Sequence, residues 1–248
     1  MLNFNKPVVM GILNATPDSF YAASRKQDEQ QIAERANEIV AQGATIIDVG
    51  ACSTRPGSEP ADEQTEMARL RQALAIVRRE QPDAVVSVDT FRPNVAKMAV
   101  EEYGADIIND VSGLLNINLR VPYILMSTQG TLHDMLIFFA QRIQQLRDIG
   151  QKDIIIDPGF GFGKTLQQNY DLMAQMDRLN VLQLPILVGI SRKSMIYKLL
   201  DITPNESLNA TTALHAIALA KGASILRVHD VKEAVEVVEI MQQLRGDG

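Results

Sequence analysis

Polar and charged residues stand at the ends of short apolar runs, and their types suit the binding of a flat heterocycle joined to an anion. Three run ends carry the acceptors Asp89, Asn109 and Asp157, and another carries Arg227 and His229. One carboxylate can accept two parallel N–H donors, whereas cations stabilise departing oxyanions. The pattern therefore indicates a ligand with a hydrogen-bonding heterocycle at one end and an anionic group at the other.

Eight runs are apolar on both faces, a pattern typical of parallel strands that are covered on both sides. The expected strands are Val8–Leu13, Thr45–Val49, Val85–Val88, Asp106–Ile108, Val121–Met126, Asp153–Ile156, Pro185–Val188 and Ser224–Val228. Segments with helical periodicity separate most of them. We expect an α/β fold, a single (β/α)8 TIM barrel, because eight strands without a second domain favour closure over an open doubly wound sheet.

Helix starts are marked by Asp62, Pro93 and Asp230, which are typical cap or first-turn residues. From Asp106, which starts the fourth strand, to Val121, which starts the fifth, there are only about 15 residues, whereas a strand, crossover helix and return strand need more than about 30. The fourth crossover helix should therefore be shortened or missing. Two helical patterns, Lys193–Leu200 and Glu206–Lys221, separate the last two strands.

The carboxyl ends of all strands in a parallel barrel open onto one face, where active sites of this fold occur. Taken singly, Thr90, Asp110 and Asp230 are explained equally well as helix caps. Seven polar ends on one face are harder to explain structurally, and they divide by charge. The acceptors occupy one arc, and the opposite arc holds most of the cations, which are Arg55, Lys193, Arg227 and His229.

Size and composition fit one soluble domain over residues 1–248. The chain is 46% hydrophobic and 22% charged, with a net charge of −6. This charge argues against general affinity for nucleic acid, and the longest apolar runs are too short to cross a bilayer. One cysteine, Cys52, excludes an internal disulfide and fits a reducing compartment, and the N-terminus carries no signal-like segment. We expect a cytoplasmic protein.

A loop that resembles the Walker A phosphate loop ends in Gly163-Lys164-Thr165, but its first glycine is replaced by Pro158. We therefore interpret this segment as a compact glycine loop, with Phe162 available to pack on a flat ligand. Without a cluster of histidines and cysteines, a zinc site is not expected. Of the three histidines, only His229 is assigned a function, because it shares a strand side with Arg227.

Taken together, seven motifs in order along nearly the whole chain resemble the dihydropteroate synthase family. They are Gly11–Phe20, Ile46–Gly57, Ser87–Thr90, Ile107–Gly113, Asp157–Gly161, Gly189–Lys193 and Arg227–Asp230. The resemblance implies a transferase of folate biosynthesis. It would join a dihydropterin pyrophosphate to 4-aminobenzoate and release pyrophosphate. It also implies a homodimer, with Glu206–Lys221 at the interface, and a target of sulfonamides.

The resemblance also implies roles for individual residues. The substrate-binding residues would be Thr54, Arg55, Pro56, Asp89, Asn109, Val111, Met126, Asp157, Phe162, Gly189, Ser191, Lys193, Arg227 and His229. Among these, the catalytic residues would be Asp89, Lys193, Arg227 and His229. Asp89, Asn109 and Asp157 would hold the pterin beside Lys193. The pyrophosphate would meet Asn14, Arg55, Arg227 and His229, with a Mg2+ cofactor near Asn14. The amine substrate would lie near Thr54, Pro56, Phe162, Ser191 and Lys193.

The chain departs from the family pattern in a few places. Ala51 and Cys52 replace a glycine and a glutamate, and Ser127 stands where a histidine is usual. Two alternatives fit the same barrel. A methyltetrahydrofolate methyltransferase binds a pterin with similar residues but needs no pyrophosphate site. A non-catalytic, pterin-binding paralogue would agree with the shortened segments near residues 113–150.

Overall fold

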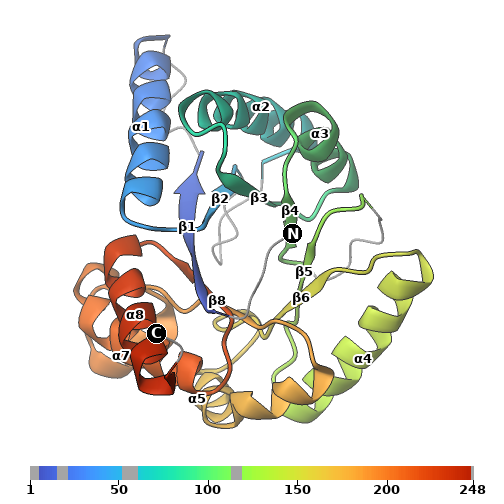
Figure 1. The fold of residues 1–248 in the computed structure, drawn as a ribbon, viewed down its shortest axis with the longest axis vertical. Coiled ribbons are helices and arrows are strands. Elements are labelled where there is room, and N and C mark those ends of the chain that lie inside the picture. The colour runs from blue at the N-terminus through green and yellow to red at the C-terminus, as the bar shows by residue number, and fades with distance from the viewer. Residues whose placement is uncertain (1–5, 16–21, 52–60, 113–118, 247–248) are drawn as a thin grey trace.

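Eight parallel strands form one sheet that curls into a barrel, with the helices outside it (Figure 1). The computed structural model describes residues 6–15, 22–51, 61–112 and 119–246. Its strands are β1 (Val8–Asn14), β2 (Ile46–Gly50), β3 (Val85–Asp89), β4 (Ile107–Asp110), β5 (Tyr123–Met126), β6 (Ile154–Asp157), β7 (Leu187–Val188) and β8 (Ile225–Val228). They lie in the order β6-β5-β4-β3-β2-β1-β8-β7, and a parallel bridge between Ile156 and Ile186 joins the two edges.

The helices follow the strands in the order that the sequence predicts. They are α1 (Ala22–Ala41), α2 (Glu63–Glu80), α3 (Pro93–Tyr103), α4 (Leu132–Asp148), α5 (Leu166–Gln175), the 3-10 helix η1 (Met176–Leu182), α6 (Ser194–Leu200), the 3-10 helix η2 (Pro204–Glu206), α7 (Leu208–Ala220) and α8 (Val231–Arg245). The predicted TIM barrel is confirmed, and strand boundaries differ from the predicted ones by no more than two residues. None of the described helices has the length and apolar character needed to cross a bilayer.

The fourth crossover differs from the others, as predicted. The described residues between β4 and β5 contain no helix; residues 113–118 lie outside the description. Before β8, in contrast, two helices replace one, because α6 ends at Leu200 and Pro204 begins the short η2 ahead of α7. Proline suits that position because its fixed φ angle matches the first turn of a helix.

Local chemistry explains several helix starts. Asp62 caps α2 by accepting a hydrogen bond from the backbone N of Thr65 at 2.9 Å, and Pro93 is the first residue of α3.

On the barrel wall, α1 packs closely on β1. A Cβ added at Gly11 would lie 2.6 Å from Cγ2 of Ile39. Only glycine leaves room for this approach of helix and strand.

Successive side chains of each strand point alternately into the barrel and out toward the helices. The inward positions form a separate apolar cluster, which consists of Met10, Ile46, Ile107, Ile124, Ile155, Leu187 and Ile225. Outward-facing residues such as Val9, Val49 and Val88 join the larger core beneath the helices. The barrel is therefore filled at its base, and the next inward positions lie closer to the open end.

Candidate active site

The inward positions directly above the apolar base are mostly polar. Two residues after the base layer, the strands carry Asp48, Ser87, Asn109, Met126, Asp157, Gly189 and Arg227. Two residues further on stand Asn14, Asp89, Ser191 and His229. Strand alternation therefore gathers most of the sequence-predicted site residues at the carboxyl ends of the strands.

Four of these residues form one connected polar cluster across β2, β3, β4 and β8. Nε of Arg227 donates to Oδ2 of Asp48 at 2.6 Å, and its Nη2 donates to Oδ2 of Asp89 at 2.8 Å. Asn109 donates to the same Asp48 oxygen at 3.2 Å. The cations are thus not confined to a separate arc as expected, because Arg227 reaches across to the acids. We call Asp48, Asp89, Asn109 and Arg227 the ion-paired side.

The ion-paired side also holds acceptors that its own residues leave unused. Oδ1 of Asp48, Oγ of Ser87 and Oδ1 of Asn109 are buried and have no hydrogen-bond partner among the described residues. Burial raises the pKa of Asp89 to about 7, against the opposing effect of Arg227. Buried acceptors without donors are costly to leave unpaired, so this floor is suited to a ligand that presents N–H groups.

The loop after β6 is held tightly against the end of β5. Asp157 accepts a hydrogen bond from the backbone N of Gly159 at 2.7 Å. Gly159 has a φ of +65°, and a Cβ on it would lie 2.1 Å from the backbone oxygen of Ser127. A side chain at this position is therefore excluded. The backbone places the carboxylate of Asp157, which is 7% exposed, toward the mouth.

Lys193 packs against this loop from the β7 side. Its Nζ donates to the backbone oxygen of Phe160 and lies 4.3 Å from the ring centre of Phe162. Burial lowers the pKa of Lys193 to about 8, although Asp157 opposes the shift. Burial likewise raises the pKa of Asp157, again against an opposing charge, that of Lys193. The two groups form a desolvated acid–base pair beside an aromatic ring.

Lys164, the Walker-like lysine, closes the same loop from within. Its Nζ donates to the backbone oxygens of Ser127, Gly159 and Phe162, at 3.2, 2.9 and 3.1 Å. The ammonium group is thus occupied by carbonyls and braces the loop, and burial lowers its pKa to about 8. We call Asp157, Phe162, Lys164 and Lys193 the loop side.

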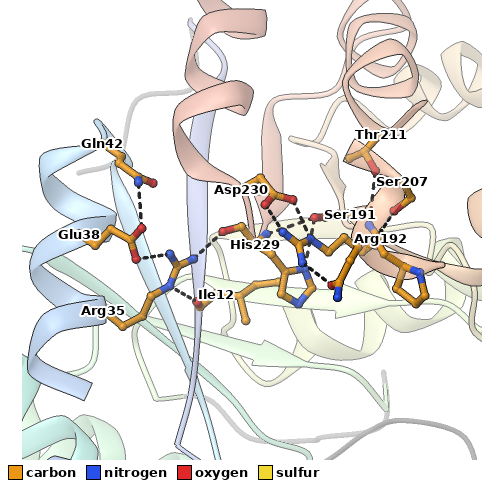
Figure 2. A network of polar contacts seen from close by, with 12 residues as sticks. Ile12, Arg35, Glu38, Gln42, Ser191, Arg192, Ser207, Thr211, His229 and Asp230 are labelled. Carbon is orange, nitrogen blue, oxygen red and sulfur yellow. Dashed lines mark hydrogen bonds and ion pairs between the residues drawn. The ribbon is translucent and has the colours of Figure 1, made fainter. Parts of the chain in front are cut away.

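A second network joins β7, β8 and η2 at the rim (Figure 2). Oγ of Ser191 accepts from the backbone N of His229 at 3.2 Å and lies 3.2 Å from its Nδ1. Arg192 donates twice to the carboxylate of Asp230 and once to Asn205. Asp230 makes no side-chain cap bond to α8. Asp230 therefore stands at the N-cap position of α8, as predicted, but its side chain does not cap the helix, because the bidentate bond with an arginine occupies both carboxylate oxygens.

His229 and Asn14 lie at the carboxyl ends of the neighbouring parallel strands β8 and β1. Burial lowers the pKa of His229 to about 4, and the positive charge of Arg227 adds to the shift. Asn14 is exposed and lines a cavity of about 230 Å³ together with Asp28, Arg35 and Arg69. Within the described residues, no group of three or more acidic, histidine or cysteine side chains is arranged to hold a metal ion.

The remaining predicted residues are placed as follows. Thr54, Arg55 and Pro56 lie outside the described residues. Val111 is half-buried just after β4, and Met126 is 1% exposed at the end of β5. An added Cβ on Gly189 would lie 3.8 Å from Cβ of Arg227 and 3.9 Å from Nζ of Lys193, so this glycine lies between the two cations.

Sequence reasoning missed Asp48 as a site residue, although it is fully buried and pairs with Arg227. The sequence did carry a signal for Asp48. Strand alternation places this aspartate of the apolar run Ile46–Val49 on the inner face of the barrel, where a buried charge needs a partner. It also missed the loop-bracing role of Lys164 and the bond between Arg192 and Asp230. The bond between Arg192 and Asp230 joins distant segments, and so does the bond from Lys164 to Ser127; residue spacing reveals neither.

Comparison with known proteins agrees with this arrangement. Residues 10–229 match the model of the pterin binding enzyme family. The dihydropteroate synthase of Escherichia coli strain K12 is 38% identical, covering 97% of this chain and 93% of the relative. The solved dihydropteroate synthase of Xanthomonas albilineans with 4-aminobenzoic acid is 33% identical with a TM-score of 0.89, covering 98% and 95% of the two chains.

The solved enzyme of Anaplasma phagocytophilum, with bound 6-hydroxymethylpterin-monophosphate, is 30% identical with a TM-score of 0.90. The matched region covers 96% of this chain and 99% of the Anaplasma chain. Likeness of this extent, in sequence and in fold, establishes the family. The chain belongs to the pterin-binding enzymes and, among them, to the dihydropteroate synthase family.

Proposed function

We propose that this protein condenses 6-hydroxymethyl-7,8-dihydropterin pyrophosphate with 4-aminobenzoate, giving 7,8-dihydropteroate and pyrophosphate. The observation that carries the proposal is the floor of buried, unused acceptors at Asp48, Ser87 and Asn109, directly beneath a guanidinium group. A pterin presents N–H donors along one edge, and its pyrophosphate presents negative charge at the other end. One ligand can therefore satisfy both halves of the mouth.

The heterocycle would rest between the two sides of the mouth. Asp89, Asn109 and Asp157 would accept its N–H groups, and Val111 and Met126 would supply apolar walls. Binding of donors favours the carboxylate form of an acid. The raised pKa values of Asp89 and Asp157 would therefore fall when the pterin binds. Lys193 would lie beside the ring, next to Phe162 and Gly189.

The pyrophosphate would lie toward the rim at Asn14, Arg227 and His229. Asp48 and Asp89 hold Nε and Nη2 of Arg227, and Nη1 makes no hydrogen bond to the described part of the chain. This nitrogen could donate to a phosphoryl oxygen without disturbing the ion-paired side. Arg55 would add a second cation from a segment outside the described residues.

A Mg2+ ion fits the rim chemically. Its usual ligands are one or two protein oxygens, water and substrate phosphates, rather than a complete protein cage. Asn14 and Asp28 line the same cavity and offer an amide and a carboxylate oxygen there. When bound, the ion would supply positive charge that stabilises the departing pyrophosphate.

The reaction breaks the bond between the pterin methylene carbon and the pyrophosphate oxygen, and pyrophosphate leaves with the electron pair. The amine nitrogen of 4-aminobenzoate then forms a bond to that carbon and loses one proton to solvent. We propose that departure runs ahead of attack, because the ring can spread positive charge and the carboxylates of Asp89 and Asp157 stabilise it. Steep slowing by electron-poor anilines, as in a direct displacement, would contradict this order.

The amine substrate would stack near Phe162 and Lys193, with Thr54, Pro56 and Ser191 around it. A sulfonamide, which has a similar aromatic amine, would compete for the same place. Ser191 begins the turn that leads into α6, so the substrate carboxylate would also lie near the start of that helix.

The decisive experiment measures pyrophosphate release from the pterin pyrophosphate, with and without 4-aminobenzoate, for the unsubstituted protein and for Lys193→Ala. We expect amine-dependent turnover that falls roughly a hundredfold or more in the variant, because a charge in contact with the reacting ring is lost. A folded protein that binds the pterin but releases no pyrophosphate would contradict an active synthase and support the pterin-binding paralogue.

We further propose a cytoplasmic homodimer whose interface includes α7. Ile217 of α7 is 44% exposed, and Ile240 and Leu244 of the neighbouring α8 are 62% and 75% exposed. Exposed apolar residues on packed neighbouring helices are typical of protein interfaces. Sedimentation analysis of the unsubstituted protein and of Ile217→Lys would test it, with a monomeric variant expected.

A further inference from the structure

Arg35 lies on α1, outside the ring of strands, yet its guanidinium group reaches the barrel mouth. Its Nη2 donates to the backbone oxygen of His229 at 2.6 Å, and its Nε donates to that of Ile12 at 3.3 Å (Figure 2). We infer that Arg35 is a positioning residue for His229 and so for the pyrophosphate of the substrate. The inference rests on the proposed function, which places the pyrophosphate at His229.

Close packing of α1 on β1 brings Arg35 to this position. Ile39 follows Arg35 by four residues and therefore lies on the same helix face. Ile39 fills the space that the missing side chain of Gly11 leaves on the strand. With that contact fixed, the preceding helical turn lies over the end of β1, where Arg35 meets the backbone oxygen of Ile12.

The bonds of Arg35 show that it positions the site rather than binding the substrate directly. Two of its nitrogens are used by backbone oxygens, and the third, Nη1, donates to Glu38 at 2.7 Å. Its side chain is 27% exposed, so the group is partly shielded from water. Although Arg35 lines the cavity beside Asn14, each of its three nitrogens already has a partner in the chain, and two of these partners are backbone oxygens at the site.

His229 is held from two directions, and Arg35 supplies one of them. Ser191 accepts from its backbone N and contacts its ring, whereas Arg35 binds its backbone oxygen. These contacts fix the peptide on both sides of the His229 side chain. Without Arg35, the junction of β8 and α8 would lose its tie to α1, and the imidazole would be less well placed.

The test compares Arg35→Ala and Arg35→Lys with two control variants. Glu38→Gln removes the charge of the outer partner of Arg35, and Arg71→Ala removes an exposed pair with Glu102 on the helix surface. Calorimetry measures binding of inorganic pyrophosphate, and steady-state kinetics gives KM for each substrate. Melting temperature is recorded for every variant.

For Arg35→Ala we expect roughly tenfold weaker pyrophosphate binding and a similar rise in KM for the pterin pyrophosphate, which is the loss expected for one misplaced ligand group. KM for 4-aminobenzoate should change less than about twofold, as should all constants of the controls. Arg35→Lys should recover part of the loss, because a lysine can reach only one of the two oxygens. Equal weakening for every ligand would indicate a purely structural role and overturn the inference.

A double-mutant cycle with His229→Ala separates positioning from a general effect of charge. If Arg35 acts through His229, Arg35→Ala should cost little further pyrophosphate affinity once the imidazole is absent. Additive losses would overturn the inference. The outcomes also separate it from the proposed function. A protein that binds pyrophosphate but forms no dihydropteroate contradicts only the function, and one that binds no pyrophosphate contradicts both.

Discussion

Buried charged groups are hydrogen-bonded in different ways on the two sides of the mouth. On the ion-paired side, one guanidinium bridges Asp48 and Asp89, and the bonds run directly between side chains of different strands. On the loop side, Lys164 and Lys193 donate to backbone carbonyls instead of to a carboxylate. The first arrangement fixes charges against each other, and the second fixes a loop and leaves its charges poorly compensated.

This difference indicates that the two sides of the mouth have different roles in substrate binding. Strands are rigid and can present matched charges, so the ion-paired side is prepared for the pterin and pyrophosphate before they arrive. The loop side gains its order from a glycine turn and a buried lysine, and its ionisable groups have shifted pKa values. We expect substitutions on the ion-paired side to affect turnover. On the loop side, loss of the brace Lys164 should affect mainly the amine substrate, whereas Lys193 lies beside both substrates.

The largest effect should come from Asp48→Asn, which keeps the shape of the side chain but leaves Arg227 with one carboxylate. Breaking a buried ion pair costs about 3–5 kcal/mol. We expect kcat/KM for the pterin pyrophosphate to fall on the order of a hundredfold or more. Steady-state kinetics checks this. In the control Asp177→Asn, an exposed pair with Lys221 is lost, and no more than about a twofold change is expected. Unchanged turnover in Asp48→Asn would show that Arg227 needs no second acid.

An intermediate effect is expected for Lys164→Met, which removes three bonds to carbonyls but fills the same space. The loop that carries Phe162 would shift, so KM for 4-aminobenzoate should rise roughly tenfold while kcat changes less. The matched control is Lys232→Met, because that lysine is 69% exposed on α8. An equal fall in binding of both substrates would contradict the division between the two sides.

The smallest effect is the pH dependence of the unsubstituted protein. Asp89 must be a carboxylate to accept N–H donors, so kcat/KM for the pterin pyrophosphate should rise as pH increases through about 7. Lys193 loses its charge above about 8, so the same constant should fall there. Lys193→Arg should move the alkaline limb upward, because arginine stays protonated. A profile that is flat from pH 6 to 9 would count against both assignments.

Much of the architecture could be predicted from the sequence, because runs that are apolar on both faces and residues typical of helix starts are local signals. Strand parity, which is also local, places Asp89, Asn109, Asp157 and Arg227 on the inner surface. The partners of these residues could not be predicted, since they depend on which strands are neighbours after closure. Arg227 was therefore assigned to an anion alone, whereas in the structure it also holds two acids.

Two residues near the mouth have side-chain partners that were not predicted from the sequence. Asp230 has the residue type and place of a helix cap, but Arg192, 38 positions earlier, arrives with two donors and takes its carboxylate. Lys164 has the place of a phosphate-binding lysine in a motif whose first glycine is replaced by Pro158, and its Nζ donates to the carbonyls of Gly159 and Phe162. Asp230 is thus bonded to a distant segment, whereas two of the three Lys164 bonds lie within its own loop.

Strand alternation also limits how this protein can change. Deletion of a single residue of β3 ahead of Val88 would turn Asp89 toward the helices and bring the apolar Val88 into the mouth. Insertions between strands carry no such penalty, because they leave the alternation intact. New substrate preferences in this scaffold should therefore arise by exchanging every second strand residue or by rebuilding loops, and length changes should be tolerated only outside the strands.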